Sequence, residues 1–388
     1  MTTNRWLILA VLFFARLTMA FQFQSVAALS PLIIDNFDVG LSEIGFLIGL
    51  YFAPGIFFAL PGGAVAARFG DKRIVAVGLV LMLAGGVLIA LTKDWNIFTA
   101  GRLIVGAGGV ILNVVMTKMV VDWFASKELS TAMAIFINSW PVGVALALLI
   151  LPILATTAGL SFAWWALAGL VGAGLLFFAL IYNAPEGVVA VTKTSERTTI
   201  PLVAVTLAGV VWALYNAALA MIFSFGPAFL TQEGYALTQA ASLTSLFMVI
   251  FAIALPLGGI VADKTGRKDA IIYLSLLSFA ALMPVAVFVP DSAFIVFCVL
   301  GALFAFGGGP TMTLPAEVLS PASRTTGMGI FFTIYYVLMM IAPRIGGGVA
   351  ESLDDAGAAI LVGAGLSLAA AASLAAFRLQ VRHQGPGG

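Results

Sequence analysis

Three arginines lie inside long apolar stretches of this sequence, where a charged side chain is costly and usually faces a cavity or a partner. They are Arg16, Arg102 and Arg344, and no aspartate or glutamate lies well inside the same stretches. A buried cation without a buried anion makes a site that is incomplete until an anion arrives. Arginine also offers a planar fork of donors that suits carboxylates and small oxyanions. The residues therefore indicate binding of a small organic or inorganic anion.

The three arginines differ in their expected roles. Arg16 lies about ten residues beyond Trp6, which at a rise of ~1.5 Å per residue puts it near the middle of a membrane-spanning helix. We assign it to substrate binding or gating. Arg344 follows Pro343 in a segment that can be kinked, and we assign it to substrate binding as well. Arg102 lies closer to the outer surface, and we expect it to have a structural or coupling role.

Helical spacing points to companions of these arginines. Gln24 shares the face of Arg16 approximately, and Thr333 and Tyr336 share the face of Arg344. Polar and aromatic side chains also gather in two other apolar runs, over residues 130–153 and 200–225. The predicted substrate-binding residues are Arg16, Gln24, Asn138, Trp140, Trp212, Tyr215, Asn216, Thr333, Tyr336 and Arg344. For each companion the alternative is ordinary packing at a helix interface.

The composition is that of a membrane protein. Of the 388 residues 62% are hydrophobic and 9% are charged, and the mean hydropathy is +1.13. The net charge of +1, without a block of like charges, gives no indication of a nucleic-acid partner. The expected partners are a small anionic substrate and the lipid bilayer, and we expect a monomer.

Polar breaks divide the sequence into about twelve apolar runs, each long enough to cross a hydrocarbon core about 30 Å thick. The predicted fold is an all-α integral membrane protein with twelve transmembrane helices in two six-helix bundles. The expected spans are 6–29, 44–66, 74–91, 97–119, 130–153, 161–182, 200–225, 240–262, 270–289, 292–314, 326–349 and 357–377. The shortest break is the one near Pro290 and Asp291.

A basic loop motif occurs twice, about 196 residues apart. The first copy reads GGAVAARFGDKR (62–73) and the second GGIVADKTGRK (258–268); near an offset of 195, TAMAIF (131–136) answers TGMGIF (326–331). A repeat this long indicates two copies of one half. The loops resemble the G-x-x-x-D-R-x-G-R-R/K signature of the major facilitator superfamily, and RLIVGAG (102–108) resembles its fourth-helix motif. The first loop departs from the signature, with Ala67 in place of the acid.

The resemblance implies secondary transporters in which this loop latches the halves in one orientation. It assigns gating or conformational roles to the loop residues and to the fourth-helix arginine: Gly63, Arg68, Asp71, Arg73, Arg102, Gly259, Asp263, Arg267 and Lys268. Asp71 is a candidate substitute for the acid missing at Ala67. The alternative is that the basic residues are anchors at the membrane surface.

The sequence predicts a bundle over 1–183, a cytoplasmic linker over 184–199, a second bundle over 200–378 and a cytoplasmic tail over 379–388. Lysines and arginines concentrate in loops that lie on one side if the N-terminus is cytoplasmic. We therefore expect a multi-pass protein of the inner membrane with both termini in the cytoplasm.

We find no catalytic constellation, metal-ligand cluster or nucleotide-binding motif in the sequence, so we expect neither an enzyme nor a cofactor. The predicted function is a secondary active transporter of a small carboxylate or oxyanion, working by alternating access as uniport, anion exchange or ion-coupled transport. The excess of buried arginine resembles the branch that handles cyanate, nitrate and nitrite, or oxalate and formate. The alternatives are an exporter of amphipathic drugs or metabolites, suggested by 30 phenylalanines and 13 methionines, and a membrane sensor or scaffold that transports nothing.

Overall fold

The chain folds into α-helices, which satisfy their own backbone hydrogen bonds and therefore suit a membrane interior. The computed structural model of the protein describes residues 4–58, 69–124, 128–183, 200–320 and 323–384. The helices of the N-terminal half are α1 (Arg5–Ala28), α2 (Ser30–Phe37), α3 (Leu41–Leu50), α4 (Ala53–Phe58), α6 (Asp71–Leu91), α7 (Trp95–Phe124), α8 (Leu129–Ala158) and α9 (Leu160–Ile181). Those of the C-terminal half are α10 (Leu202–Gln232), α11 (Leu237–Thr265), α12 (Lys268–Phe288), η1 (Pro290–Ser292), α13 (Ala293–Phe306), α14 (Gly308–Met312), η2 (Leu314–Glu317), α15 (Arg324–Leu353) and α16 (Gly357–Gln384).

Twelve segments within the described residues are long and apolar enough to cross a membrane, which confirms the number expected from the sequence. The short break expected near Pro290 is the 3-10 turn η1, which separates α12 from α13. Two spans are interrupted. The second changes from α3 to α4 at Tyr51 and Phe52, and the tenth changes from α13 to α14 at Gly307.

The described residues group into two compact units. The first contains residues 4–39, 50–58, 69–124 and 128–183, and the second contains 40–49, 200–320 and 323–384. Residues 40–49, which make up most of α3, therefore group with the C-terminal helices. The linker expected over 184–199 lies outside the described residues.

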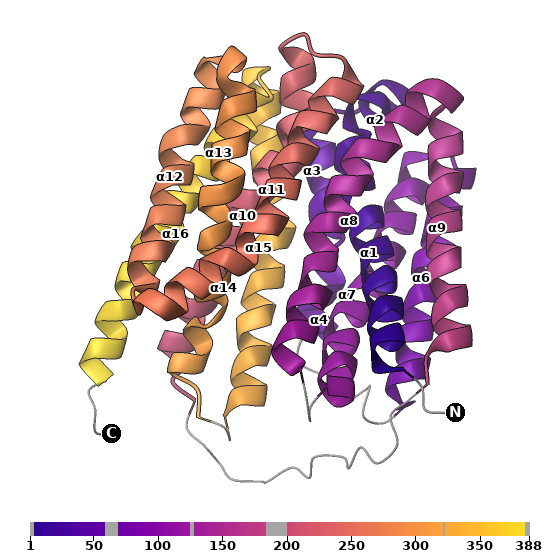
Figure 1. Cartoon of the computed structure of the whole chain (residues 1–388). Helices are drawn as coiled ribbons and strands as arrows, with labels where there is room; N and C mark the ends of the chain where they lie inside the picture. Colours follow the sequence, from indigo (N-terminus) through magenta and orange to yellow (C-terminus); the bar gives the residue numbers. More distant parts are fainter. Residues whose placement is uncertain (1–3, 59–68, 125–127, 184–199, 321–322, 385–388) are drawn as a thin grey trace. The chain divides into compact units, whose positions relative to one another are not determined.

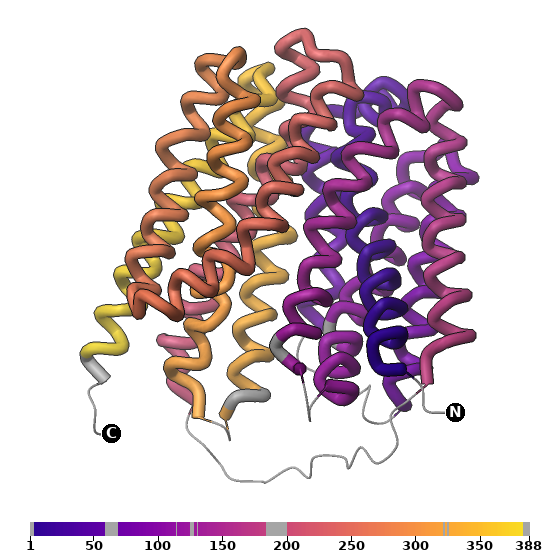
Figure 2. Tube along the Cα trace, viewed as in Figure 1, coloured from indigo at the N-terminus to yellow at the C-terminus, as the bar shows by residue number. Residues whose placement is uncertain are grey.

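The same helix pairs pack in each unit. In the first unit α1 packs against α8 and α9, and α6 packs against α7 and α9. In the second unit their repeat equivalents do the same: α10 packs against α15 and α16, and α12 packs against α13 and α16 (Figure 1). Each unit is a bundle of long helices in the chain trace (Figure 2). The internal repeat in the sequence is therefore also a repeat in three dimensions.

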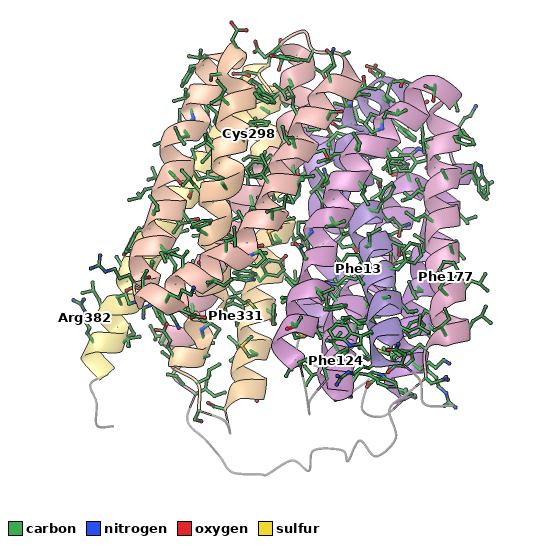
Figure 3. All side chains as sticks on the ribbon, in the orientation of Figure 1. Phe13, Phe124, Phe177, Cys298, Phe331 and Arg382 are labelled. Atoms are coloured by element: carbon green, nitrogen blue, oxygen red, sulfur yellow. The ribbon has the colours of Figure 1, made fainter. Side chains whose placement is uncertain are left out.

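Large apolar side chains project from the outer faces of the helices. Phe177 on α9 is 46% exposed and is labelled in Figure 3, and Leu180 on the same helix is 72% exposed. Extensive exposed apolar surface on a folded chain marks contact with a membrane or a partner. The twelve apolar spans show that this apolar surface faces lipid. The protein is therefore a multi-pass membrane protein.

Candidate functional site

Arg16 lies halfway along α1 and is held by neutral groups from two neighbouring helices. Its Nε and Nη2 donate to Asn113 Oδ1 of α7 at 3.3 and 3.2 Å. Its Nη1 donates to the backbone carbonyls of Phe136 and Ile137 of α8 at 2.9 and 3.0 Å. The guanidinium carbon also lies 4.8 Å from the centroid of the Phe136 ring. These partners orient a half-buried guanidinium without cancelling its charge.

A proline explains why α8 can offer the Ile137 carbonyl to Arg16. In a helix the carbonyl of residue 137 accepts from the N–H of residue 141, and Pro141 has no N–H. The Ile137 carbonyl therefore cannot accept the usual hydrogen bond from position 141 of α8. Arg16 Nη1 donates to it instead. The neighbouring Phe136 carbonyl also accepts from Ser139 Oγ. The proline therefore helps to build the site from within the helix.

Arg102 is enclosed. Its side chain is 1% exposed, and it donates from Nη1 to the Gln22 carbonyl at 3.1 Å and from Nη2 to the Phe23 carbonyl at 2.7 Å. The guanidinium carbon lies 4.9 Å from the Tyr51 ring centroid and 5.6 Å from that of Phe23. Arg102 joins α7 to the C-terminal half of α1 and to the interruption of the second span. This arrangement favours the structural role that we expect for it.

Trp212 of α10 is the centre of an aromatic cluster in the second unit. It stacks with Tyr215 at a centroid distance of 6.0 Å and with Phe331 at 6.4 Å, and Tyr335 is also 6.4 Å away. Its indole Nε1 is buried and has no hydrogen-bond partner among the described residues. The Asn216 side chain donates to the Trp212 carbonyl at 2.8 Å.

Tyr215 is fixed more firmly than Trp212. Its hydroxyl donates to the Phe304 carbonyl at 2.7 Å, and its ring stacks on Phe304 at 4.3 Å. Ser275 Oγ donates to the same carbonyl at 2.7 Å. The structure thus brings the predicted residues Trp212, Tyr215 and Asn216 together, with Tyr215 acting as a wall rather than as a free hydroxyl.

Arg344 and its expected companions are in different surroundings. The Arg344 side chain is exposed, and its guanidinium carbon lies 5.2 Å from the Phe46 ring centroid. Tyr336 is 3% exposed and packs edge-on against Tyr335. Thr333 Oγ1 donates to the Gly329 carbonyl of its own helix at 2.9 Å. A shared helix face therefore does not give these three residues a shared environment.

The remaining predicted residues of the first unit are spread over α1 and α8. Gln24 is completely buried on α1. Trp140 packs on Phe23, with ring centroids 5.1 Å apart. Asn138 Oδ1 is buried without a hydrogen-bond partner among the described residues, one residue beyond the Ile137 carbonyl that holds Arg16. Asn138 is thus the predicted companion nearest in sequence to the groups that hold Arg16.

A charge cluster joins the ends of α6 and α7 in the first unit. Lys118 Nζ lies 2.5 Å from Asp71 Oδ2 and 2.7 Å from Asp122 Oδ2. Lys72 donates to the carbonyl of Tyr182, and burial raises the pKa of the Tyr182 hydroxyl to about 12. Asp71 thus ties two helices of its own unit together.

Three other gating residues are predicted in the first loop: Gly63, Arg68 and Arg73. Arg73 is exposed at the start of α6. Gly63 and Arg68 lie outside the described residues.

The second unit has a comparable cluster, built from a different cation. Arg378 of α16 forms ion pairs with Asp269, at the start of α12, and with Glu317 of η2. The predicted gating residues Asp263 and Arg267 are exposed near the end of α11, and Lys268 is half-buried at the start of α12. The close helix approach is at Gly258, where a Cβ would lie 2.3 Å from Phe306 Cα; a Cβ at Gly259 would meet nothing within 4 Å.

Sequence reasoning missed Asn113 and Phe136, two of the groups that hold Arg16. Asn113 was detectable as a polar side chain inside an otherwise apolar run of the fourth span. The Ile137 carbonyl was detectable through Pro141, four residues later. The cations and acids at the span ends were visible too, but their pairing, such as Lys118 with Asp122, requires helix boundaries that the sequence places only approximately.

Comparison with known proteins gives three findings. The sequence profile of the Major Facilitator Superfamily matches residues 12–343 and, in a second match, residues 203–387. A stretch of 163 residues is 31% identical to the multi-drug resistance efflux pump PmrA of Streptococcus pneumoniae, in each of two strains. That match covers 40% of this chain and 40% of the pump, so the chain spans less than half the length of this curated relative.

Solved transporter structures share the fold over nearly the whole chain. The nucleoside transporter NupG has a TM-score of 0.78 at 14% identity, covering 96% of this chain and 99% of that chain. The D-xylose-proton symporter has a TM-score of 0.78 at 15% identity, covering 94% and 96%. A bacterial homolog of the human lysosomal transporter Spinster has a TM-score of 0.75 at 16% identity, covering 97% and 96%. With its duplicated six-helix units and a family match over most of its length, this chain belongs to the Major Facilitator Superfamily.

Proposed function

We propose that this protein is a secondary transporter that carries a small carboxylate or oxyanion by alternating access, as uniport, anion exchange or ion-coupled transport. Transporters built from inverted or paired repeats bind substrate near the bilayer midplane. Arg16 is the twelfth residue of the 24-residue helix α1, and this central position supports a binding role for its charge near the midplane.

The observation that carries the proposal is the way Arg16 is held. The amide oxygen and the two carbonyls are neutral dipoles, and they fix the direction of the guanidinium. The described acids of all twelve spans lie near the span ends, as Asp122 and Glu351 do. An anion at Arg16 would be attracted to a guanidinium that neutral groups of α7 and α8 hold in place.

The same proposal includes the orientation of the chain in the membrane and the membrane in which it lies. Arg5, Lys72 and Arg378 lie at span ends that the alternation of twelve spans puts on one side of the membrane. Because cytoplasmic loops are enriched in lysine and arginine, we propose that both termini lie in the cytoplasm and that the protein lies in the inner membrane. We propose a monomer as the working form.

The test is a ligand panel on the purified protein in detergent at constant ionic strength. Unfolding temperature is measured with monocarboxylates, dicarboxylates, inorganic oxyanions and neutral lipophiles. A ligand at about 100 times its dissociation constant adds roughly 2.7 kcal/mol to the free energy of unfolding. We expect one anion class to stabilise the wild type, and Arg16→Gln to abolish the shift. Arg382→Gln is the matched control, because Arg382 is exposed near the end of α16 (Figure 3). Equal shifts in wild type and Arg16→Gln would contradict the proposal.

A second candidate is export of amphipathic compounds. It is favoured by the stretch that is 31% identical to an efflux pump and by the aromatic cluster around Trp212. The same panel distinguishes the two candidates. Export predicts that neutral lipophiles stabilise the protein and that Arg16→Gln responds to them as the wild type does.

A further inference from the structure

The side-chain amide of Asn113 on α7 has one defined orientation beside Arg16. A guanidinium has only hydrogen-bond donors, so the amide atom that faces it is the oxygen. Asn113 Oδ1 accepts from Arg16 Nε at 3.3 Å and from Arg16 Nη2 at 3.2 Å. This contact determines which end of the amide carries the nitrogen, a choice that is otherwise ambiguous for an asparagine. The two N–H donors of Nδ2 therefore lie next to the guanidinium and are not used by it.

Helix packing within the first unit holds Asn113 in this place. Both α1 and α7 belong to that unit, and they approach closely one turn away, where a Cβ at Gly109 would lie 3.4 Å from Met19 Cγ. Gly109 comes four residues before Asn113, and Met19 comes three residues after Arg16, so the two contacts lie on matching faces of the helices. Asn113 is half-buried. Its amide is thus positioned by two packed helices and is still partly accessible.

The hydroxyl groups nearest to this pair are already engaged by backbone carbonyls. Thr117, on the next turn of α7, donates to the Asn113 carbonyl at 2.8 Å. Ser139 of α8 donates to the Phe136 carbonyl, which also accepts from Arg16. Asn113 Nδ2 differs from both, because it has no acceptor among the residues that the structure describes. A donor beside a cation suits an oxygen atom of a bound anion.

We propose that Asn113 is a second ligand of the anion bound at Arg16, with Nδ2 donating to one oxygen while the guanidinium binds another. The inference rests on the proposed function, because it concerns the same site. It narrows the substrate to anions with at least two oxygen atoms, since two donors at different places are satisfied best by two separate acceptors. It also explains the neutral amide: a carboxylate at position 113 could accept from Arg16 but could not donate to a substrate.

The experiment compares anions that have several oxygens with an anion that is a single atom. The probes are acetate, oxalate, nitrate and bromide, and dissociation constants come from the unfolding temperature of the purified full-length chain in detergent against probe concentration, at constant ionic strength. Asn113→Leu removes both the acceptor and the donor at similar volume. Asn113→Asp keeps the acceptor, removes the donor and adds a negative charge. Unfolding temperatures without a probe check that each variant is folded.

The matched controls are Asn96→Leu and Asn96→Asp. Asn96 lies on the same helix as Asn113 but is exposed near the start of α7. The controls therefore make the same chemical changes in the same helix, away from Arg16. We expect both of them to bind all four probes as the wild type does.

We expect the wild type to bind at least one of the three oxygen-bearing probes about tenfold more tightly than bromide. Asn113→Leu weakens that probe by about tenfold, the value of one hydrogen bond to a charged group. Its bromide binding stays within about threefold of wild type, because Arg16 keeps its two hydrogen bonds to α8. Asn113→Asp weakens every probe by at least about tenfold, because the new carboxylate pairs with Arg16 and repels anions.

Several results would overturn the inference while the anion site stands. If Asn113→Leu weakens bromide as much as the oxygen-bearing probe, Asn113 only orients Arg16 and does not touch the ligand. Wild-type affinity in Asn113→Leu or in Asn113→Asp, or equal affinity of the wild type for bromide and the oxygen-bearing probes, also contradicts the role of Nδ2. The proposed function fails, and the inference with it, if no oxygen-bearing probe binds the wild type or if Arg16→Gln binds them unchanged.

Discussion

The three membrane-embedded arginines differ in access and in partners. Arg102 is 1% exposed and is shared between two carbonyls and two rings, so a solute cannot reach it without unpacking α7 from α1. Arg16 is half-buried and is held at an angle set by Asn113 and α8. A charge that is both fixed and reachable is the better ligand site, because the cost of ordering the side chain is met before the ligand arrives.

The role of Pro141 can be tested directly. Pro141→Ala restores an N–H that competes with Arg16 for the Ile137 carbonyl. We expect the variant to fold with an unchanged or raised unfolding temperature and to bind anions about three- to tenfold more weakly, because Arg16 is less firmly held. Calorimetric titration with the stabilising anion measures the change.

Pro152→Ala is the matched control, since Pro152 is the second proline inside α8. Its removal should leave the dissociation constant unchanged. Equal weakening in both proline variants would mean that α8 flexibility, rather than the Ile137 carbonyl, determines affinity.

For single residues, the sequence predicts which side chains belong to a candidate site better than it predicts the groups that those side chains contact. Arg16 is recognisable because a cation in an apolar run is rare. Its partners are less visible, because two are backbone carbonyls and the third, Asn113, is 97 residues away in the chain. Arg344 illustrates the same limit: helical spacing fixes a face, and packing with other helices decides which parts of that face are buried.

Glycines bring α3 close to α15 within the second unit. A Cβ at Gly45 would lie 2.1 Å from the Pro343 carbonyl oxygen, and one at Gly49 would lie 2.0 Å from that of Met340. Glu351 of α15 also accepts a hydrogen bond from the Ser42 backbone N–H at 2.9 Å. Small residues at i and i+4 allow such backbone contact in membrane helices. The interruption at Tyr51 and Phe52 separates this segment from α4, which groups with the first unit.

Gly45→Ala should break this approach. The added methyl group meets backbone atoms that cannot rotate away, so we expect a loss of about 1–3 kcal/mol in the free energy of unfolding. Thermal unfolding of the purified variant in detergent measures the loss.

Gly169→Ala serves as the control. A Cβ at Gly169 of α9 meets nothing within 4 Å, so this variant should be neutral or slightly stabilising. A Gly45 variant as stable as the Gly169 variant would show that α3 does not depend on the close contact with α15.

Across the whole molecule, the duplication extends to the charge clusters at the span ends. The acids are partly equivalent in the two halves, but the cation comes from a different helix in each. Asp122 and Glu317 are equivalent by the offset of 195 residues, and each is one of two carboxylates that share a single cation. The cation is Lys118 of α7 in the first unit and Arg378 of α16 in the second. The sequence repeat predicts two bundles with the same helix order, whereas the source of each cation depends on packing that the repeat does not fix.

Lys118→Met and Arg378→Met test these clusters. Each leaves two carboxylates close together without their shared cation, and we expect each to cost about 0.5–1 kcal/mol, as for partly exposed ion pairs. Because the clusters lie in different units, the double variant should show the sum of the two losses. Thermal unfolding at low and high salt measures them, with Arg382→Met as control. A double variant no less stable than either single variant would contradict independent clusters.

The central claim is that a positive charge at Arg16 moves an anion across the membrane, and flux in proteoliposomes tests it most directly. Vesicles loaded with the anion that stabilises the protein are diluted into labelled anion, and uptake is compared among wild type, Arg16→Gln and Arg382→Gln. We predict rapid counterflow in the wild type and Arg382→Gln, and a reduction of at least about tenfold in Arg16→Gln. Uptake by Arg16→Gln at the wild-type rate would contradict the claim.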